Sequence, residues 1–577
     1  MIQALSNVVL QDNLISLSVV EMAGLLFVYF LIVFGIVLKI ARTSEDTDEF
    51  IVANRQVGLG LGAGSTTATY IWAASFFSAA IAGYQYGIAG PIHYGLWGAC
   101  ALFFIWPYGL RMRELSPEGH TLPELIKARH GKFSHLTTVF ANSFGSTVSL
   151  TVNLTAAGSL ISMFSSISYE WGVIGIGVII FAYVVKSGFR SSVITDYVQI
   201  TAMFIVAIVG IPMIVSSMGG VSAMYTGLDT NLTSAQADFF SKEALFGQGI
   251  PMFVAILSWA IGNQTLIQRV FGIKEDKIKY SFMTASVGYG AIVIGIGTLG
   301  FAAAAVGITP VQGDPNNLVP QLASTHLPFA FAIAFMLLIL SALSSTADSD
   351  LSALSAIFMT DIWNQYVVSN NPSYRNYTLW VGRGTMAFFT SIAVYVAMSQ
   401  ISILFAVMFM SVLWGCIVFP VISSLYWEDV SDIGFSLGSV GGLIAGVLAA
   451  GEFVSFSTGP FELIYAPLVT IGFGVVFALL AFTFLPVKPS AVIGLIAAIA
   501  IIPAVPQILA GGYALTVGAT SAYGLSAVIC GGIALMSDHD YDFDQLKHEV
   551  ENLSTSPQEI AQDDQSPSET PATGSTD

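Results

Sequence analysis

The residues best suited to chemistry lie in the stretch 341–363, which follows a run of strongly apolar residues. Before Asp361 this stretch carries six serines, two threonines and two further aspartates. A single aspartate at mid-membrane costs about 2.5–3.5 kcal/mol on insertion scales, so these oxygens must meet water, a cation or another helix. Close helix packing through small residues is the alternative explanation for the serines. On a helical period of 3.6 residues the polar positions form two neighbouring stripes: Ser345, Ser349 and Ser352, and Ser341, Ser344 and Asp348.

A second buried acid is expected at Asp196, about one turn and a half inside the apolar stretch 191–216. Such an acid needs a partner, and it is either a cation ligand or proton carrier, or one half of a salt bridge to an arginine such as Arg190. Asp348 and Ser349 could complete a cation site with Asp196, because sodium prefers several oxygen ligands. The alternative for Asp348 is hydration in a water-filled vestibule.

Aromatic and amide side chains gather in the second apolar stretch and the turn after it. Such a lining suits a small neutral polar solute, since rings stack on its faces and amides meet its donors and acceptors. An aromatic belt at the membrane interface is the alternative, especially for Tyr84 and Tyr94. The set comprises Trp72, Tyr84, Gln85, Tyr86, His93 and Tyr94.

The composition identifies the kind of molecule that must position these groups. Of its 577 residues, 55% are hydrophobic and 10% are charged, and the mean hydropathy is +0.76. Apolar runs of spanning length recur along the chain, which predicts an all-α polytopic membrane protein with about 15 spans. The sequence holds no phosphate-binding loop, serine-nucleophile or zinc-protease pattern, so neither an enzyme nor an ATP-driven pump is indicated.

Charge predicts the orientation of the chain and the nature of its end. Lysine and arginine fall on alternate loops between the predicted spans, and only Lys242 clearly falls on the other side. The positive-inside rule then predicts that the N-terminus is outside the cell and that the C-terminal tail is in the cytoplasm. The expected location of the chain is the plasma membrane. The net charge is −17, and 11 of the 36 acidic residues lie in 538–577. This tail, rich in Ser, Pro, Gln and Thr, is predicted to be disordered.

Two spans, 56–83 and 247–269, are predicted to be interrupted helices. The first is crowded with Gly, Ser, Thr and Ala, and the second holds Gly262, Asn263 and Gln264. Each begins a group of five spans, and five is an odd number, so the two groups would have opposite topology, as in many secondary transporters. The predicted units are 1–55 with one extra helix, 56–216 and 247–426 as the two repeats, 217–246 as an outer loop, 427–536 as extra helices and 537–577 as the tail.

Three motifs in the same order resemble the sodium:solute symporter family. They are Ser345-Thr346 followed by Asp361-Ile362-Trp363, then Thr195-Asp196-Tyr197-Val198-Gln199, and Asn263-Gln264 leading to Gln268-Arg269. Trp363 stands where members of the family usually have Tyr. Within the family the chain is most similar to the urea active transporters, through residues 71–74, 84–91 and the pattern from His120-Thr121 to 126–131. Tyr84 and His93 depart from that subfamily, which tends to have Trp at the first position and an aromatic at the second.

The resemblance implies a leucine-transporter-like 5+5 inverted-repeat core with one extra N-terminal helix and about four extra C-terminal helices. It implies sodium-coupled, or alternatively proton-coupled, uptake of a small neutral solute, with urea as the first choice, by alternating access. The expected partners are this solute and the lipid bilayer rather than a nucleic acid. The alternatives are a sodium symporter for a carboxylate or proline, and a transporter-like sensor or passive channel.

The resemblance also implies site residues, one position at a time. The sodium site would use backbone carbonyls of one broken helix and hydroxyls of the polar helix. A second site for a cation or proton would include Asp348, where members with that site have a hydroxyl residue. The implied sets are Ala73, Phe76, Ala342, Ser345 and Thr346 for sodium, Asp196, Asp348 and Ser349 for the second site, and Trp72, Gln85, Tyr86, Asn263 and Gln264 for the solute.

Overall fold

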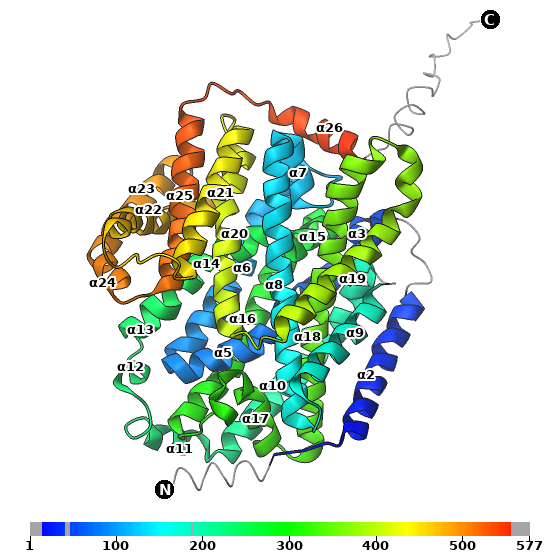
Figure 1. Cartoon of the computed structure of the whole chain (residues 1–577), viewed down its shortest axis with the longest axis vertical. Coiled ribbons are helices and arrows are strands. Elements are labelled where there is room, and N and C mark those ends of the chain that lie inside the picture. Colours follow the sequence, from blue (N-terminus) through cyan, green and yellow to red (C-terminus); the bar gives the residue numbers. More distant parts are fainter. Residues whose placement is uncertain (1–13, 41–46, 186–187, 555–577) are drawn as a thin grey trace, which may run out of the picture.

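The chain folds into a bundle of long helices (Figure 1). The computed structural model describes residues 14–40, 47–185 and 188–554. Within these ranges eleven helices are long and apolar enough to cross a membrane, and extended pairing is limited to two isolated bridges. The prediction of a helical polytopic membrane protein is confirmed, whereas the exact number of spans stays a prediction.

The first group of core helices follows α2 (Val19–Ile40) and the short α3 (Thr47–Val52). Its first span is interrupted, as predicted, because α4 ends at Tyr70 and α5 begins at Ala73. Glycine and β-branched threonine give α4 little helical propensity of its own. The group consists of α4 (Leu59–Tyr70), α5 (Ala73–Tyr86), α6 (Ala89–Leu115), α8 (Lys132–Phe164), α9 (Tyr169–Val184) and α10 (Gly188–Ser217).

The second group repeats this arrangement. Its first span breaks at Asn263, whose side-chain oxygen accepts a hydrogen bond from the backbone N–H of Thr265 at 3.0 Å and so caps the helix that follows. The group consists of α14 (Ile250–Gly262), α15 (Gln264–Gly272), α16 (Glu275–Ala305), α18 (Phe329–Ile357), α19 (Thr378–Ala397) and α20 (Ile403–Tyr426). Widened π-helical turns continue α18 from Phe358 to Val368.

Further helices surround this core. Between the groups lie α11 (Gly220–Gly227), α12 (Ser234–Ala237) and α13 (Lys242–Ala244), and α17 (Leu318–His326) precedes α18. After the core come α21 (Asp432–Ala450), α22 (Pro460–Phe482), α23 (Val487–Ile501), α24 (Val505–Ala510) and α25 (Ala514–Leu535). The helices α22, α23 and α24, coloured orange, lie at the edge of the molecule opposite α2 (Figure 1).

A glycine seam joins α21 to α25. A Cβ atom at Gly442 would lie 2.5 Å from the carbonyl oxygen of Ala522, and one at Gly446 would lie 3.0 Å from that of Gly518. Positions four residues apart share one helix face, so these glycines let the two backbones approach closely, as small residues do between membrane helices.

The predicted disordered tail contains a folded helix, so that prediction is wrong for residues 543–554. Helix α26 (Phe543–Ser554) packs on α7 (Leu122–His130), and both lie at the upper end of the bundle in Figure 1. Its Leu546 and Val550 are buried, because apolar positions four residues apart share one face. The remainder of the predicted tail, 555–577, lies outside the described residues.

The short helix α7 begins at a side-chain cap, which Thr121 supplies. The Thr121 hydroxyl accepts a hydrogen bond from the backbone N–H of Glu124. The same hydroxyl donates to Asp361 Oδ2 at 2.8 Å, and the Leu122 N–H donates to Gln264 Oε1 at 3.1 Å. The α7 cap therefore attaches this helix both to the end of α18 and to α15.

His120 lies beside this cap between two carboxylates. Its ring nitrogens are 2.9 Å from Asp48 Oδ1 and 3.3 Å from Glu124 Oε2. Burial alone would lower the pKa of His120, but the two carboxylates outweigh burial and raise the pKa to about 9. Burial alone would raise the pKa of Asp48, but His120 and Arg55 outweigh burial and lower this pKa to about 2.

The thermal stability of the protein is therefore expected to depend on pH above neutrality. The stabilisation from protonated His120 is complete below the unfolded pKa of about 6.5 and is lost as pH rises through about 9. The unfolding temperature should fall by roughly 3 °C between pH 7 and 9.5, and His120→Gln should flatten this slope. An equal slope in the variant would assign the pH dependence to another group.

Candidate functional site

The two helix breaks meet at a small, partly open cavity in the core. Its volume is about 20 Å³, which is room for about one water molecule. Aromatic rings and hydroxyl groups form its wall, and none of its lining residues carries a charge. They are Thr69, Tyr70, Trp72, Tyr94, Ser149, Trp259, Asn263, Thr265, Tyr289, Thr346, Met410 and Trp414.

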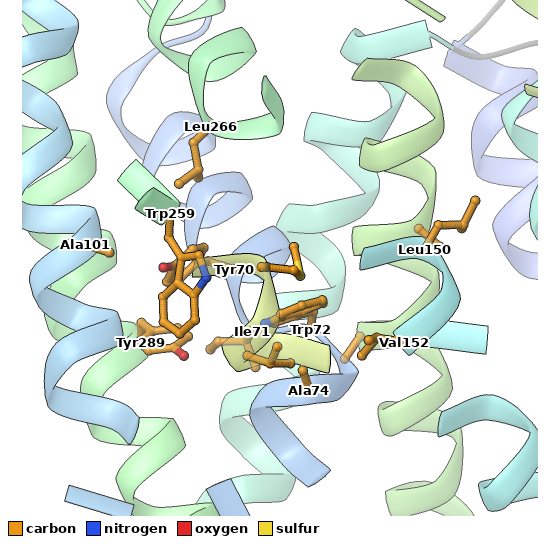
Figure 2. Close-up of a cluster of buried hydrophobic side chains, with 14 of the residues drawn as sticks. Tyr70, Ile71, Trp72, Ala74, Ala101, Leu150, Val152, Trp259, Leu266 and Tyr289 are labelled. Atoms are coloured by element: carbon orange, nitrogen blue, oxygen red, sulfur yellow. The ribbon is translucent and has the colours of Figure 1, made fainter. Parts of the chain in front are cut away.

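The aromatic side of the cavity is a packed cluster centred on Tyr70, the last residue of α4. The Tyr70 ring lies edge-on to Trp259 at 6.4 Å between centroids and is tilted against Tyr289 at 4.8 Å. Figure 2 shows Tyr70, Trp259 and Tyr289 gathered together, with Trp72 beside them. Because Tyr70 and Trp72 flank the break and Trp259 lies one turn before the other break, the two interruptions bring these rings to one place.

Hydroxyls of α18 reach the first break from the other side. The Thr346 hydroxyl donates to the backbone carbonyl of Thr69 at 2.7 Å, and the Ser345 hydroxyl donates to Asp196 of α10. The carbonyl of Thr69 lies where the helix is ending, so a side chain can reach it. The structure thus brings together α18, α10 and the broken helix, as the sequence motifs suggested.

Asp196 is fully buried and forms an ion pair with Arg269. The two side chains are 0% and 1% exposed, and Arg269 Nη2 lies 3.0 Å from Asp196 Oδ2. The guanidinium also donates to Thr69, to Ser65 Oγ at 3.1 Å and to Ser349 Oγ at 3.1 Å. One cation of the chain itself therefore contacts most of the oxygens that surround Asp196.

Arg269 is one of the site residues that sequence reasoning missed, as are Tyr70, Ser149, Trp259 and Trp414 of the cavity wall. The sequence motif Gln268-Arg269 gave Arg269 no role, but it lies in α15 with its side chain inside the bundle. The available signal was the need of Asp196 for a partner. Arg190, the partner considered from the sequence, has a side chain outside the described residues.

Asp348 is buried rather than hydrated, so the vestibule alternative is wrong. Its side chain accepts hydrogen bonds from Ser192 Oγ at 2.7 Å and from the Tyr183 hydroxyl at 3.2 Å. Ser349 lies between this carboxylate and Arg269, because its Oγ is 3.3 Å from Asp348 Oδ1 and 3.1 Å from Arg269 Nη2. The three predicted residues of the second site are thus neighbours in one buried network.

The predicted solute residues separate into two sets. Trp72 and Asn263 line the cavity. Gln85 is exposed at the far end of α5, and Tyr86 lies next to Gly247. Gln264 is buried beside the cavity but accepts from the backbone N–H of Leu122. The cavity is therefore not lined by Gln85, Tyr86 or Gln264. Helix α5 places Gln85 and Tyr86 a full helix length from the break. Gln264 instead attaches α15 to the start of α7.

The predicted sodium residues lie on α5 and α18, two helices that contact each other near the first break. Ala73 and Phe76 are in the first turns of α5, and Ala342, Ser345 and Thr346 are in the middle of α18. Helix α18 contacts both α4 and α5. Ala342 and Phe76 are buried, and the hydroxyl oxygens of Ser345 and Thr346 are the kind of hard ligand that sodium prefers.

Comparison with known proteins places this geometry in context. The family model described as the sodium:solute symporter family matches residues 50–442. The probable urea active transporter 3 of Schizosaccharomyces pombe is 21% identical over 72% of this chain and 67% of its own length. The urea-proton symporter DUR3 of Oryza sativa subsp. japonica is 19% identical over 70% of this chain and 60% of its own length. The chain thus spans about two thirds or less of these relatives.

One solved structure shares the fold over most of both chains. It is a Na⁺-coupled sialic acid symporter in a substrate-bound outward-open state, with a TM-score of 0.63 and 17% identity. The match covers 84% of this chain and 98% of that one. The broken helices and the α18 hydroxyls therefore sit in a fold that occurs in a sodium-coupled transporter.

Proposed function

Because this chain belongs to the sodium:solute symporter family, we propose that it takes up a small neutral solute, urea, together with sodium. Family membership makes it a multi-pass membrane protein that carries out secondary active symport, and not an enzyme. The solute and the coupling ion are the parts of this statement that are proposed. The urea transporters among its relatives support urea as the solute. The sodium-coupled symporter with the same fold supports a cation as the coupling ion.

The single observation that carries the solute proposal is the uncharged lining of the 20 Å³ cavity at the two breaks. A carboxylate such as proline or a sugar acid would need a positive group near it, because an unpaired charge is costly to bury. Arg269 is a buried cation that donates to the cavity residues Thr69 and Thr265, and Asp196 already neutralises it. A cavity of this size must widen to admit any solute, and a molecule of a few heavy atoms requires less widening than a larger one.

Sodium is proposed to bind between α5 and α18, at the carbonyls of Ala73, Phe76 and Ala342 and the hydroxyls of Ser345 and Thr346. Thr346 presently donates to the Thr69 carbonyl, so its oxygen already faces the first break. An ion that bridges the two helices favours the state in which they are close together. Its release after inward opening then loosens the solute pocket, which couples the two movements.

The Asp196 site is proposed to hold Arg269 in place of a second sodium. The guanidinium contacts Asp196, Ser65, Thr69 and Ser349, which are the oxygens that a second cation would need. A sodium ion there would meet an adjacent positive charge at the cost of strong repulsion. One coupling cation for each solute is therefore the expected stoichiometry.

The N-terminus is proposed to be outside and the C-terminal end in the cytoplasm of the plasma membrane. Lysine and arginine of the loops that contain α7 and the start of α16 lie on the inner side in this orientation.

The test is uptake of labelled urea into proteoliposomes that contain the full chain. An inward sodium gradient should drive urea above its equilibrium level, and a proton gradient alone should not. Accumulation of urea with a proton gradient alone would show that the coupling ion is the proton and not sodium. The name of the rice relative gives the proton this role in that protein. Uptake that only reaches equilibrium under either gradient would contradict symport and favour a passive channel.

A further inference from the structure

Three side chains around the cavity hold hydrogen-bond donors that have no acceptor. They are the hydroxyl of Tyr70 and the indole N–H groups of Trp259 and Trp414, and among the described residues none of these atoms has a partner. All three atoms are sealed from solvent. A buried donor without an acceptor costs free energy, so an arrangement that keeps three of them around one cavity is costly unless a ligand supplies the acceptor.

Two hydroxyl groups on the same wall can accept hydrogen bonds from a ligand but cannot donate them. The Ser149 hydroxyl gives its proton to Asp350 Oδ2 at 2.6 Å, and the Thr265 hydroxyl gives its proton to Asn263 Oδ1 at 2.6 Å. A hydroxyl has one proton, so these two oxygens can only accept from a ligand. The cavity therefore presents donors from its aromatic rings and acceptors from its hydroxyls.

From this division we infer that the cavity selects an uncharged carbonyl group flanked by N–H groups, as in urea and simple amides. Tyr70, Trp259 and Trp414 bind the carbonyl oxygen, and Ser149 and Thr265 accept from the amide nitrogens. Guanidinium has the shape of urea but only donors, so it leaves the three aromatic donors unpaired. Acetate has only acceptors, so it leaves both hydroxyl oxygens without a donor.

The inference rests on the proposed function, because it names the groups that recognise the proposed solute. The full chain in proteoliposomes would be tested for competition of labelled urea uptake by acetamide, guanidinium and acetate. Acetamide should compete, and guanidinium and acetate should need concentrations at least about tenfold higher. Equal competition by guanidinium and acetamide would overturn the inference.

Tyr70→Phe removes one donor and almost no volume. Its urea KM should rise about tenfold, with a smaller preference for urea over guanidinium. The unfolding temperature without solute should stay the same or rise, because no bond of the solute-free protein is lost. A purely structural role for Tyr70 would give the reverse pattern. An unchanged KM and unchanged preference would contradict the assignment.

Trp97→Phe is the matched control for the two tryptophans. The Trp97 indole N–H also has no partner among the described residues, but Trp97 does not line the cavity. Trp259→Phe and Trp414→Phe should raise the urea KM about tenfold, and Trp97→Phe should not. An increase of similar size in all three would overturn the inference, since it would mean that loss of any buried indole disturbs uptake.

A second measurement separates this inference from the proposed function. Binding of urea, acetamide and guanidinium to the detergent-solubilised chain can be followed by tryptophan fluorescence, because Trp72, Trp259 and Trp414 line the cavity. Selective binding of the two carbonyl compounds without any uptake would support the inference and contradict the transport proposal. Uptake of urea with no preference for carbonyl compounds would do the reverse.

Discussion

Arg269→Met is expected to lower the free energy of unfolding by about 3–5 kcal/mol, because it leaves a buried carboxylate without its counter-charge. Asp196 is 0% exposed, and its other contacts are neutral hydroxyls that cannot replace a guanidinium. Asp196→Asn should be destabilising for the complementary reason, since Arg269 would then be the unpaired charge. Chemical unfolding in detergent measures both effects.

The double variant Asp196→Leu/Arg269→Met is the control for this pair. It removes both charges, and replacing a buried pair by apolar residues is often neutral or stabilising. It should therefore be more stable than either single variant. Equal losses in the single and double variants would show that the residues act independently and that their 3.0 Å contact carries no coupling.

Sodium provides a further readout on Arg269→Met. The variant frees Asp196 and Ser349, so raising sodium should restore part of its stability and make the sodium dependence of uptake steeper. The same increase in sodium should have a smaller effect on the wild-type chain. A variant that is insensitive to sodium would contradict the proposal that Arg269 occupies the place of a second cation.

Thr346→Ala is expected to raise the sodium concentration for half-maximal uptake at least about tenfold, the equivalent of one hydrogen bond to a charged group. It removes a hydroxyl that meets the carbonyl of Thr69 at the first break. Thr346→Ser keeps the oxygen and should retain most of the sodium affinity. Measured sodium titrations of urea uptake test the difference.

Ser344→Ala is the matched control on the same helix. The Ser344 hydroxyl bonds within α18 to the carbonyl of Leu340, so its loss should leave the sodium titration unchanged. If Thr346→Ala behaved like Ser344→Ala, sodium would have to bind elsewhere. If both variants lost affinity, the effect would reflect general disturbance of α18.

The sequence predicted the parts of the fold that depend on local preference. The two breaks were indicated by the Gly, Ser, Thr and Ala of the first span and by Gly262, Asn263 and Gln264 of the second, and both breaks are present. The Thr121 cap at the start of α7 is an equally local feature. Each of these features is decided within a few residues, where helix propensity and capping act.

Contacts between distant helices were harder to predict. Arg190 is close to Asp196 in sequence, but Arg269 meets it in space, and that choice depends on how α15 turns after Asn263. Gln85 and Tyr86 belong to the same aromatic and amide cluster as Trp72 in sequence. A helix rises 1.5 Å for each residue, so they lie roughly 20 Å farther along α5 and away from the cavity.

The prediction of a disordered tail failed for residues 543–554 because composition was averaged over too long a segment. Acidic and small polar residues dominate the segment 538–577 as a whole, but Leu546 and Val550 give its first part an apolar face. Tyr541, just before α26, covers Arg129 of α7, with the guanidinium carbon 3.7 Å from the ring centroid. A cation over an aromatic face is an attractive contact that charge counting does not anticipate.

This contact connects α26, through α7, to the helices of the proposed site. Helix α7 is attached to α15 and to the end of α18, and α26 is attached to α7. Lys547 is exposed on α26, so a fluorescent dye can be carried there without touching the solute or sodium sites. A change in the fluorescence of this dye when urea and sodium are added would show that α26 follows the helices of the proposed site.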